Sequence, residues 1–139
     1  MNKVFGTLSG VNTTKMEESK GGFTYLSWSD AWTAVSEKFD DVSFEKHTFE
    51  IESNHPDHVG KRTLPYVMDQ FGNCYVMVTV TIQGKAITEV YPVLDLRNKP
   101  VKGWDSFLVN KALQRCLTKC LAYHGLGIHI YRGEDFPDD

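Results

Sequence analysis

The sequence predicts an α+β fold in which an antiparallel β-meander sheet is packed by an N-terminal amphipathic helix and a long C-terminal helix. Apolar side chains recur at helical spacing in residues 28–39 and 105–124, which predicts the two helices. Residues 74–82 place five apolar side chains at the two-residue period of a strand. The order helix, antiparallel strands, helix differs from the alternation that builds a parallel sheet.

The chain of 139 residues suits a single domain, residues 1–139, because it is long enough for one hydrophobic core but too short for two large lobes. We divide it into a loose N-terminal arm (1–24), a core (25–132) and an acidic end (133–139). The arm is rich in glycine, serine, threonine and lysine, and one short strand is expected near Lys3–Leu8.

The first helix is expected to begin after Ser27, a suitable N-cap residue. Its apolar stripe consists of Trp28, Ala31, Trp32, Val35 and Phe39. Strands are expected at Val42–Glu52 with a distortion near Lys46–His47, at Tyr66–Asp69, at Cys74–Ile82 and at Ala86–Leu94. A polar loop is expected over Ser53–Thr63, and turns at Phe71–Asn73 and Gln83–Lys85. Pro92 cannot donate a ladder hydrogen bond, so the last strand should lie at an edge or end there.

The long helix is expected from about Asp105 to His124, followed by Gly125, a residue type that commonly ends helices. Its apolar face consists of Val109, Leu113, Cys116, Leu117, Cys120 and Leu121. Leu126–Tyr131 is apolar enough for a closing strand or an extended segment.

Basic residues concentrate next to and within this helix. Six basic residues and one acid between Arg97 and Lys119 give a local charge of +5, although the whole chain carries −3. Lys111, Arg115 and Lys119 repeat at every fourth residue opposite the apolar face, with no acid at the same spacing to relieve their repulsion. We interpret the stripe as a polyanion-binding surface; a solvated helix face is the alternative.

Aromatic residues flank the basic block, and nucleic-acid bases stack on such rings while lysine and arginine follow the phosphates. The flanking rings are Trp104, Tyr123 and Tyr131, and Arg132 adds another charge. By contrast, Trp28, Trp32 and Phe107 lie on apolar stripes, so we expect them in the core.

Cys116, Cys120 and His124 repeat at helical spacing, which resembles a set of zinc ligands. We interpret them instead as core residues, because both cysteines lie among leucines of the apolar face. His55 and His58 are the second weak candidate for a metal, and an exposed loop explains them equally well. We therefore expect no metal ion.

Enzyme motifs are absent from the sequence: it has no phosphate-binding loop, no complete dinucleotide fingerprint and no nucleophile elbow. We expect a protein that is not an enzyme, with no catalytic residue and no cofactor. The alternative from a different class is a Mg²⁺-dependent nuclease centred on Asp95, with Asp69, Glu89 and Lys99 around it. A protein-interaction module of a replication complex is a further alternative.

Three ordered segments of the chain resemble one known family. They are Tyr25–Trp28 with Ala31 and Trp32; Pro92–Asp95 with Arg97–Val101; and a C-terminal block of Asn110–Ala112, Gln114–Leu117, Lys119, Leu121, Ala122, His124–Gly127, Tyr131 and Gly133–Asp135. Together they resemble the bacteriophage single-strand annealing proteins, in the group whose domain is known as SSAP RNA-binding. The resemblance runs from about Tyr25 to Pro137.

The resemblance implies ATP-independent annealing of single strands in phage homologous recombination, on a fold related to the eukaryotic annealing-ring proteins. It makes Arg97, Asn98, Lys99, Lys111, Arg115 and Lys119 candidates for nucleic-acid contact, to which charge and ring position add Lys102, Tyr131 and Arg132. The expected partners are single-stranded DNA or RNA, further copies of the chain in a ring or filament, and a host or phage single-strand-binding protein. Three cysteines, with no secretory signal and no membrane-spanning stretch, favour the cytoplasm and exclude a membrane partner.

Overall fold

Strand β7 (Cys74–Ile82) is the central strand of the main sheet in the computed structural model, which describes residues 2–55, 58–101 and 105–132. Three strands pair with β7, all antiparallel: β3 (Val42–Lys46), β6 (Val67–Met68) and β8 (Lys85–Pro92). Two hairpins lie outside this sheet, β1 (Glu17–Lys20) with β2 (Phe23–Leu26) and β4 (Phe49–His55) with β5 (His58–Leu64). β3 therefore pairs with β7 and not with β4, its neighbour in the chain. The β4–β5 hairpin and β6 lie between β3 and β7 in the sequence.

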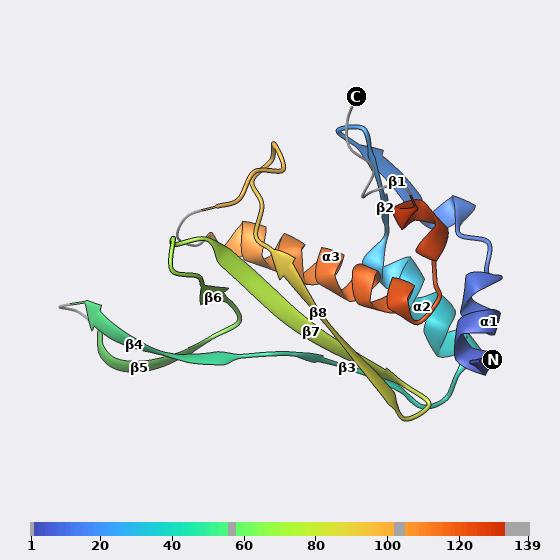
Figure 1. The fold of residues 1–139 in the computed structure, drawn as a ribbon, viewed down its shortest axis with the longest axis horizontal. Coiled ribbons are helices and arrows are strands. Elements are labelled where there is room, and N and C mark those ends of the chain that lie inside the picture. The colour runs from blue at the N-terminus through green and yellow to red at the C-terminus, as the bar shows by residue number, and fades with distance from the viewer. Residues whose placement is uncertain (1, 56–57, 102–104, 133–139) are drawn as a thin grey trace.

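The α-helices are α1 (Lys3–Ser9), α2 (Trp28–Lys38) and α3 (Ser106–Tyr123). Two short 3₁₀ helices follow α1 and α3, namely η1 (Thr14–Met16) and η2 (Ile128–Tyr131). Helix α3 packs across β7 and β8, and α2 packs against α3 (Figure 1). The predicted α+β class, with antiparallel strands and both helices, is confirmed. Within the described ranges, no helix has the length and apolar character needed to cross a membrane.

The core lies between α3 and one face of the sheet. Alternation along β7 buries Cys74, Val76, Val78, Val80 and Ile82, as predicted. The predicted apolar face of α3 is buried against them. This packing hides about half of the residues of β7 and leaves its other face half-exposed.

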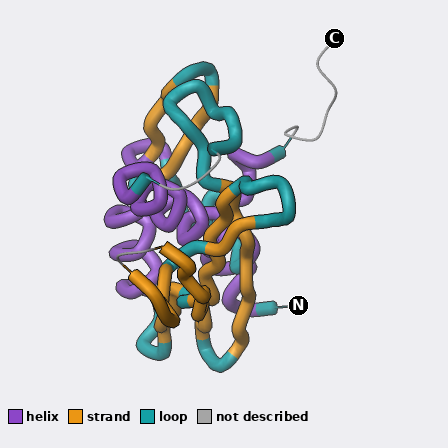
Figure 2. The backbone as a smooth tube through the Cα atoms, turned by 90° about the vertical axis from the view of Figure 1, so that its left-hand side faces the viewer, coloured by secondary structure: helices purple, strands orange, loops and turns teal. Residues whose placement is uncertain are grey.

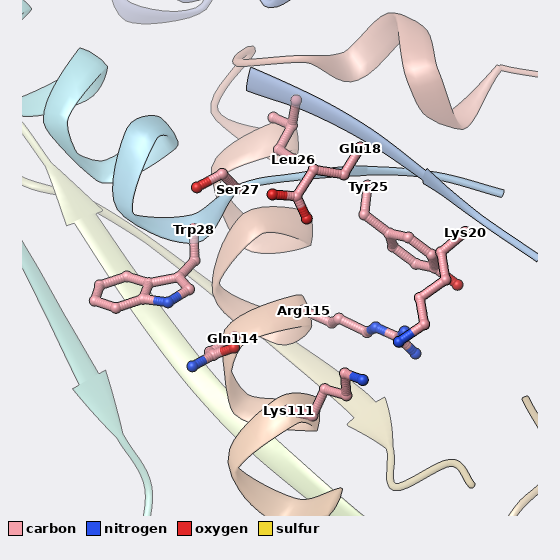
Figure 3. Close-up of a pocket in the computed structure, with 9 residues that line it drawn as sticks. All are labelled: Glu18, Lys20, Tyr25, Leu26, Ser27, Trp28, Lys111, Gln114 and Arg115. Atoms are coloured by element: carbon pink, nitrogen blue, oxygen red, sulfur yellow. The ribbon is translucent and has the colours of Figure 1, made fainter. Parts of the chain in front are cut away.

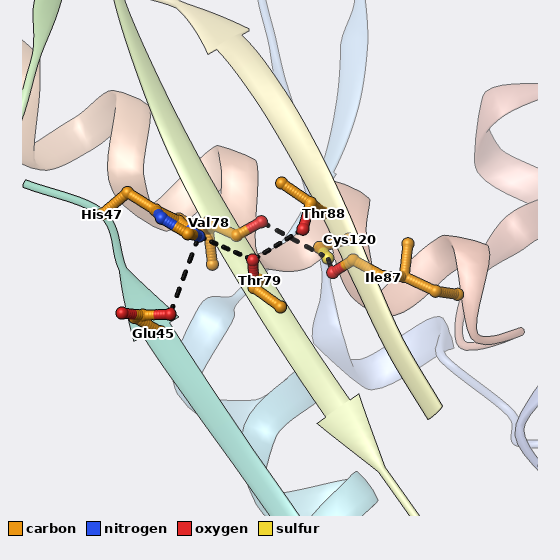
Figure 4. Close-up of polar contacts among 7 residues, drawn as sticks. All are labelled: Glu45, His47, Val78, Thr79, Ile87, Thr88 and Cys120. Carbon is orange, nitrogen blue, oxygen red and sulfur yellow. Dashed lines mark hydrogen bonds and ion pairs between the residues drawn. The ribbon is translucent and has the colours of Figure 1, made fainter. Parts of the chain in front are cut away.

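Three polar side chains of α3 reach backbone carbonyls of the sheet. Cys116 Sγ donates to the Glu89 carbonyl at 3.3 Å. Cys120 Sγ donates to the Ile87 carbonyl at 3.0 Å, a bond drawn in Figure 4. Burial raises the pKa of Cys116 to about 12 and that of Cys120 to about 11, so both thiols are neutral. The interpretation of these cysteines as core residues is confirmed.

His124 completes this series at the end of α3. Its Nε2 lies 2.9 Å from the Val80 carbonyl, and because a carbonyl only accepts, Nε2 carries the proton. Its Nδ1 is buried and has no hydrogen-bond partner among the described residues. Burial lowers the pKa of His124, and this effect outweighs the hydrogen bond to Val80.

Both ends of α3 follow the sequence prediction. The Asp105 carboxylate accepts from the Phe107 and Leu108 amides at 2.9 and 3.2 Å, which caps the first turn. Gly125 follows the helix at φ +121°, and a Cβ on it would lie 2.7 Å from the Phe5 carbonyl. This close approach seats α1 against the end of α3.

Three predicted segments are wrong. Lys3–Leu8 is not a strand, because Asn2 caps a helix there and Leu8 is fully buried, so this part of the arm is packed and not loose. Ser53–His55 and His58–Thr63, within the predicted loop over Ser53–Thr63, are not a loop, because they belong to the paired strands β4 and β5. Leu126–Tyr131 is not extended, because Gly127 at φ +69° turns the chain into η2.

Other predictions need smaller corrections. The predicted distortion at Lys46–His47 is a complete break, since β3 ends at Lys46 and β4 begins at Phe49. Trp28 and Phe107 are not core residues, because they are 42% and 64% exposed. Both lie in the first turn of their helix, before the part of the helix that packs on the core. The turn at Gln83–Lys85 and the end of the edge strand β8 at Pro92 are confirmed.

The terminal segments are tied together by one polar cluster. The buried Thr13 hydroxyl donates to Glu17 Oε2 at 2.9 Å and lies 3.3 Å from His129 Nε2. His129 also lies 3.8 Å from Glu17. The cluster therefore links the segment before β1 to η2.

We predict that His124 makes the fold sensitive to acid. Its pKa is lower in the folded than in the unfolded chain, so the unfolded chain takes up the proton first as the pH falls below about 6.5. Stability is therefore full above this pH and is lost below it. Thermal unfolding should show a smaller loss of stability between pH 7 and 5 for His124→Gln than for the wild type. Parallel profiles for His124→Gln and the wild type would contradict this.

We also predict that Cys116→Ser lowers the free energy of unfolding by about 1–3 kcal/mol, because it places a strongly polar group in an apolar stripe. Urea unfolding measures this, and Ser106→Ala at an exposed position is the control, with an expected change within about 0.5 kcal/mol. A chelator should leave the melting temperature unchanged. A loss of stability that zinc restores would show that Cys116, Cys120 and His124 bind metal.

Candidate nucleic-acid interface

The basic stripe of α3 lies in a groove between two other parts of the chain. Hairpin β1–β2 forms one wall, and the loop of residues 95–99 after β8 forms another. Both project beyond α3 on the same side of the molecule (Figures 1 and 2). We call this the basic groove and define it by Lys20, Tyr25, Asn98, Lys111, Arg115 and Lys119.

Aromatic rings contact all three cations of the stripe. Lys111 Nζ lies 5.5 Å from the centre of the Phe107 ring. The Arg115 guanidinium carbon lies 4.2 Å from the centre of the Tyr25 ring on β2. Lys119 Nζ lies 5.9 Å from the ring centres of both Tyr91 on β8 and Tyr131 on η2. These cation–π contacts fix the cations in place without neutralising their charge.

No carboxylate of the described residues forms an ion pair with Lys111, Arg115 or Lys119. Glu18 and Asp95 line the pockets of the groove but stay beyond ion-pair distance of the stripe. The groove therefore keeps a net excess of positive charge, which is the property that attracts a polyanion.

Lys20 on β1 approaches Lys111 across the groove. Side-chain hydrogen bonding with Lys20 lowers the pKa of Lys111, and partial burial and repulsion by Lys20 and Arg115 lower it further. The two ammonium groups therefore repel one another, and an anion between them would remove this repulsion.

The loop of residues 95–99 is shaped by Asp95. Its Oδ1 accepts from the Arg97 and Lys99 amides at 2.8 and 3.0 Å, and these bonds lower the pKa of Asp95. Asn98 adopts φ +58°, and its Oδ1 accepts from Arg115 Nη1 at 3.4 Å. The ionised Asp95 therefore holds the loop in a form that exposes Arg97 and Lys99 beside the stripe.

The nine residues predicted from sequence fall into three groups. Asn98, Lys111, Arg115, Lys119 and Tyr131 lie in or against the groove, and Arg97 and Lys99 are exposed on its loop. Arg132 is exposed at the end of η2, where no described contact joins it to the stripe. Lys102 lies outside the described residues, as does Trp104.

The groove also contains residues that the sequence prediction missed, namely Lys20, Tyr25, Tyr91, Trp28 and Gln114. The sequence analysis placed Lys20 in the N-terminal arm and Tyr25 just before the first helix, far from the stripe in sequence. The signal that would have found their hairpin is Gly21-Gly22, since paired glycines between two short strands favour a two-residue turn.

The acidic residues of the nuclease alternative do not form one cluster. Asp69 Oδ1 accepts from the Phe71 and Asn73 amides at 2.8 and 3.0 Å in the turn before β7, and Asp95 shapes its own loop. Across the part of the chain that the structure describes, no three His, Cys, Asp or Glu side chains converge as metal ligands would. Both aspartates act instead as turn residues.

A comparison with protein families identifies the chain. A sequence model of the family described as Sak Single Strand Annealing Protein matches residues 3–139, a range that includes both walls and the floor of the basic groove. Searches among curated proteins and among solved structures found no match. The family match confirms the resemblance to single-strand annealing proteins that the ordered segments indicated. The chain belongs to the Sak single strand annealing protein family.

Proposed function

We propose that the protein binds single-stranded DNA in the basic groove and anneals complementary strands without ATP, as a step of phage homologous recombination. One observation carries the proposal: in a member of a single-strand annealing family, unneutralised cations and tyrosine rings line the same groove. Cations follow a phosphate backbone, and rings accept bases of any sequence.

Contacts of this kind favour annealing because they hold the strand mainly by its backbone. Phosphate contacts position a strand without reading its sequence, so base edges stay available for pairing. Neutralised phosphates also repel a second strand less. No covalent bond is made or broken in the process, and neither a catalytic group nor ATP is required.

We also propose that copies of the chain assemble. One short groove makes few phosphate contacts, whereas linked grooves on one strand gain effective concentration. The open sheet face supports this proposal: Tyr75, Met77, Thr79 and Thr81 lie on the side of β7 away from α3 and are half-exposed. A head-to-tail contact of this face would give a ring or a filament.

The open sheet face has a mixed character that suits a contact between copies. A polar row crosses it, in which Thr79 Oγ1 lies 2.6 Å from both His47 Nε2 and Thr88 Oγ1 (Figure 4). Beside this row, Met77 pairs across the strands with Val90, which is 44% exposed. Burial of the apolar pair would stabilise a contact between copies, and hydrogen bonds to the polar row would make that contact specific.

The remaining partners follow from the chemistry of the groove. Its cations and rings accept DNA and RNA alike, so RNA of equal length is the natural competitor. A host or phage single-strand-binding protein is a further proposed partner, because such proteins coat the same substrate. The cytoplasm is the proposed location, since Cys116 and Cys120 are buried thiols and not disulfides.

We predict that changing Lys111, Arg115 and Lys119 together to Ala lowers the affinity for single-stranded DNA and flattens its salt dependence. Each lost phosphate contact should reduce the slope of log affinity against log salt by about 0.7. The control is the triple change of Lys38, Lys46 and Lys85 to Ala, which removes the same charge from exposed positions outside the groove. An unchanged slope in the first variant would show that α3 is not part of the binding site.

The same proteins test annealing directly. Labelled complementary oligonucleotides should form duplex faster with the wild type and the control than with the groove variant, in the absence of ATP. Strands should stay intact with and without Mg²⁺. Cleavage in Mg²⁺ would indicate the nuclease alternative, and neither annealing nor cleavage would favour the interaction module.

We predict that the wild type has a mass above one subunit at micromolar concentration, with or without single-stranded DNA. Changing Met77 and Val90 together to Lys should shift it to one subunit, because two charges replace the apolar pair. Phe71→Lys is the control, since Phe71 is exposed in the turn before β7. Light scattering measures the mass, and a wild type that stays monomeric in both conditions contradicts assembly.

A further inference from the structure

A pocket of about 320 Å³ opens at one end of the basic groove, between hairpin β1–β2, the first turn of α2 and the middle of α3. We infer that this pocket binds one nucleotide of the DNA strand, turned in from the rest, with its phosphate beside Lys20 and Lys111 and its base against Trp28. The inference rests on the proposed function and adds a base-binding site to it. The volume lies at the lower end of the range for small-molecule sites, which begins at about 300 Å³.

The two ends of the pocket differ in chemistry. Lys20, Lys111 and Arg115 extend their charged groups toward one end, whereas Trp28 and Gln114 lie together at the other (Figure 3). A nucleotide has the same division into an anionic phosphate and an apolar, hydrogen-bonding base.

The cationic end is suited to a phosphate. Lys20 and Lys111 repel one another there, and the Arg115 guanidinium carbon lies 4.2 Å from the centre of the Tyr25 ring, with one nitrogen bonded to Asn98. A phosphate oxygen between the lysines would remove the repulsion and accept from both ammonium groups.

The opposite end is suited to a base. Trp28 is 42% exposed, and no ring of the described residues packs against its indole. Its face is thus available for stacking, the contact that single-strand-binding proteins use for bases of any sequence. The Gln114 amide both donates and accepts, so it can bond to the edge of any base.

Glu18 sets the direction in which the nucleotide enters. It lines the same pocket from β1, and its carboxylate lies between the two ends in Figure 3. The charge repels a phosphate from the Trp28 end and accepts a hydrogen bond from base N–H groups. The nucleotide therefore enters in one orientation only.

The test compares an oligonucleotide of dT with an abasic strand of the same length. Trp28→Leu should weaken binding of the dT strand by roughly 5- to 150-fold, the range found for stacked bases, and should leave binding of the abasic strand unchanged. Phe71→Leu is the matched control, because Phe71 is a 69% exposed ring in the turn before β7, outside the pocket, and this variant should bind both strands as the wild type does.

The outcomes separate the inference from the proposed function. Wild-type binding of both strands with no effect of Trp28→Leu, or with equal losses on both strands, overturns the base pocket and leaves the groove in place. A wild type that binds neither strand overturns both. If Trp28→Leu does not fold, fluorescence of the variant with Trp32→Phe and Trp104→Phe, which keeps Trp28 alone, decides: the dT strand should quench it more than the abasic strand, and equal quenching overturns the pocket.

Discussion

The seating of α3 on β7 and β8 is the constraint on which the site depends. Cys116, Cys120 and His124 each reach a strand carbonyl, so the helix cannot rotate or slide without breaking all three bonds. Arg115 and Lys119 each precede one of these buried cysteines by a single position, about 100° around the helix. The buried row therefore determines where the basic stripe faces, and a chemically inert row of core residues orients the charged one.

The groove brings together positive charges that repel one another. Like charges one turn apart destabilise a helix by tenths of a kcal/mol per pair, and Lys20 adds to this from another element. Tyrosine rings offset part of the cost and prevent the cations from turning away. The site is thus organised before a ligand arrives, so little conformational entropy of these side chains is lost on binding.

Periodic elements could be predicted from the sequence, and elements held by distant contacts could not. The stripes of α2 and α3 and the alternation of β7 repeat within one segment, so local spacing reveals them. Hairpin β4–β5 is held by backbone pairing between largely polar segments, and η2 follows from a glycine conformation. In the site, spacing revealed Lys111, Arg115 and Lys119, whereas Lys20 and Tyr25 join them only through the tertiary fold.

Residues from opposite ends of the chain form the walls of the groove. Lys20 and Tyr25 come from the N-terminal hairpin, Tyr131 comes from η2, and the Thr13 cluster links the two regions. During synthesis, the hairpin leaves the ribosome long before α3 and η2 exist, so a growing chain has scattered cations but no groove. The groove therefore forms only after the C-terminal part of the chain has been synthesised and has packed against the N-terminal hairpin.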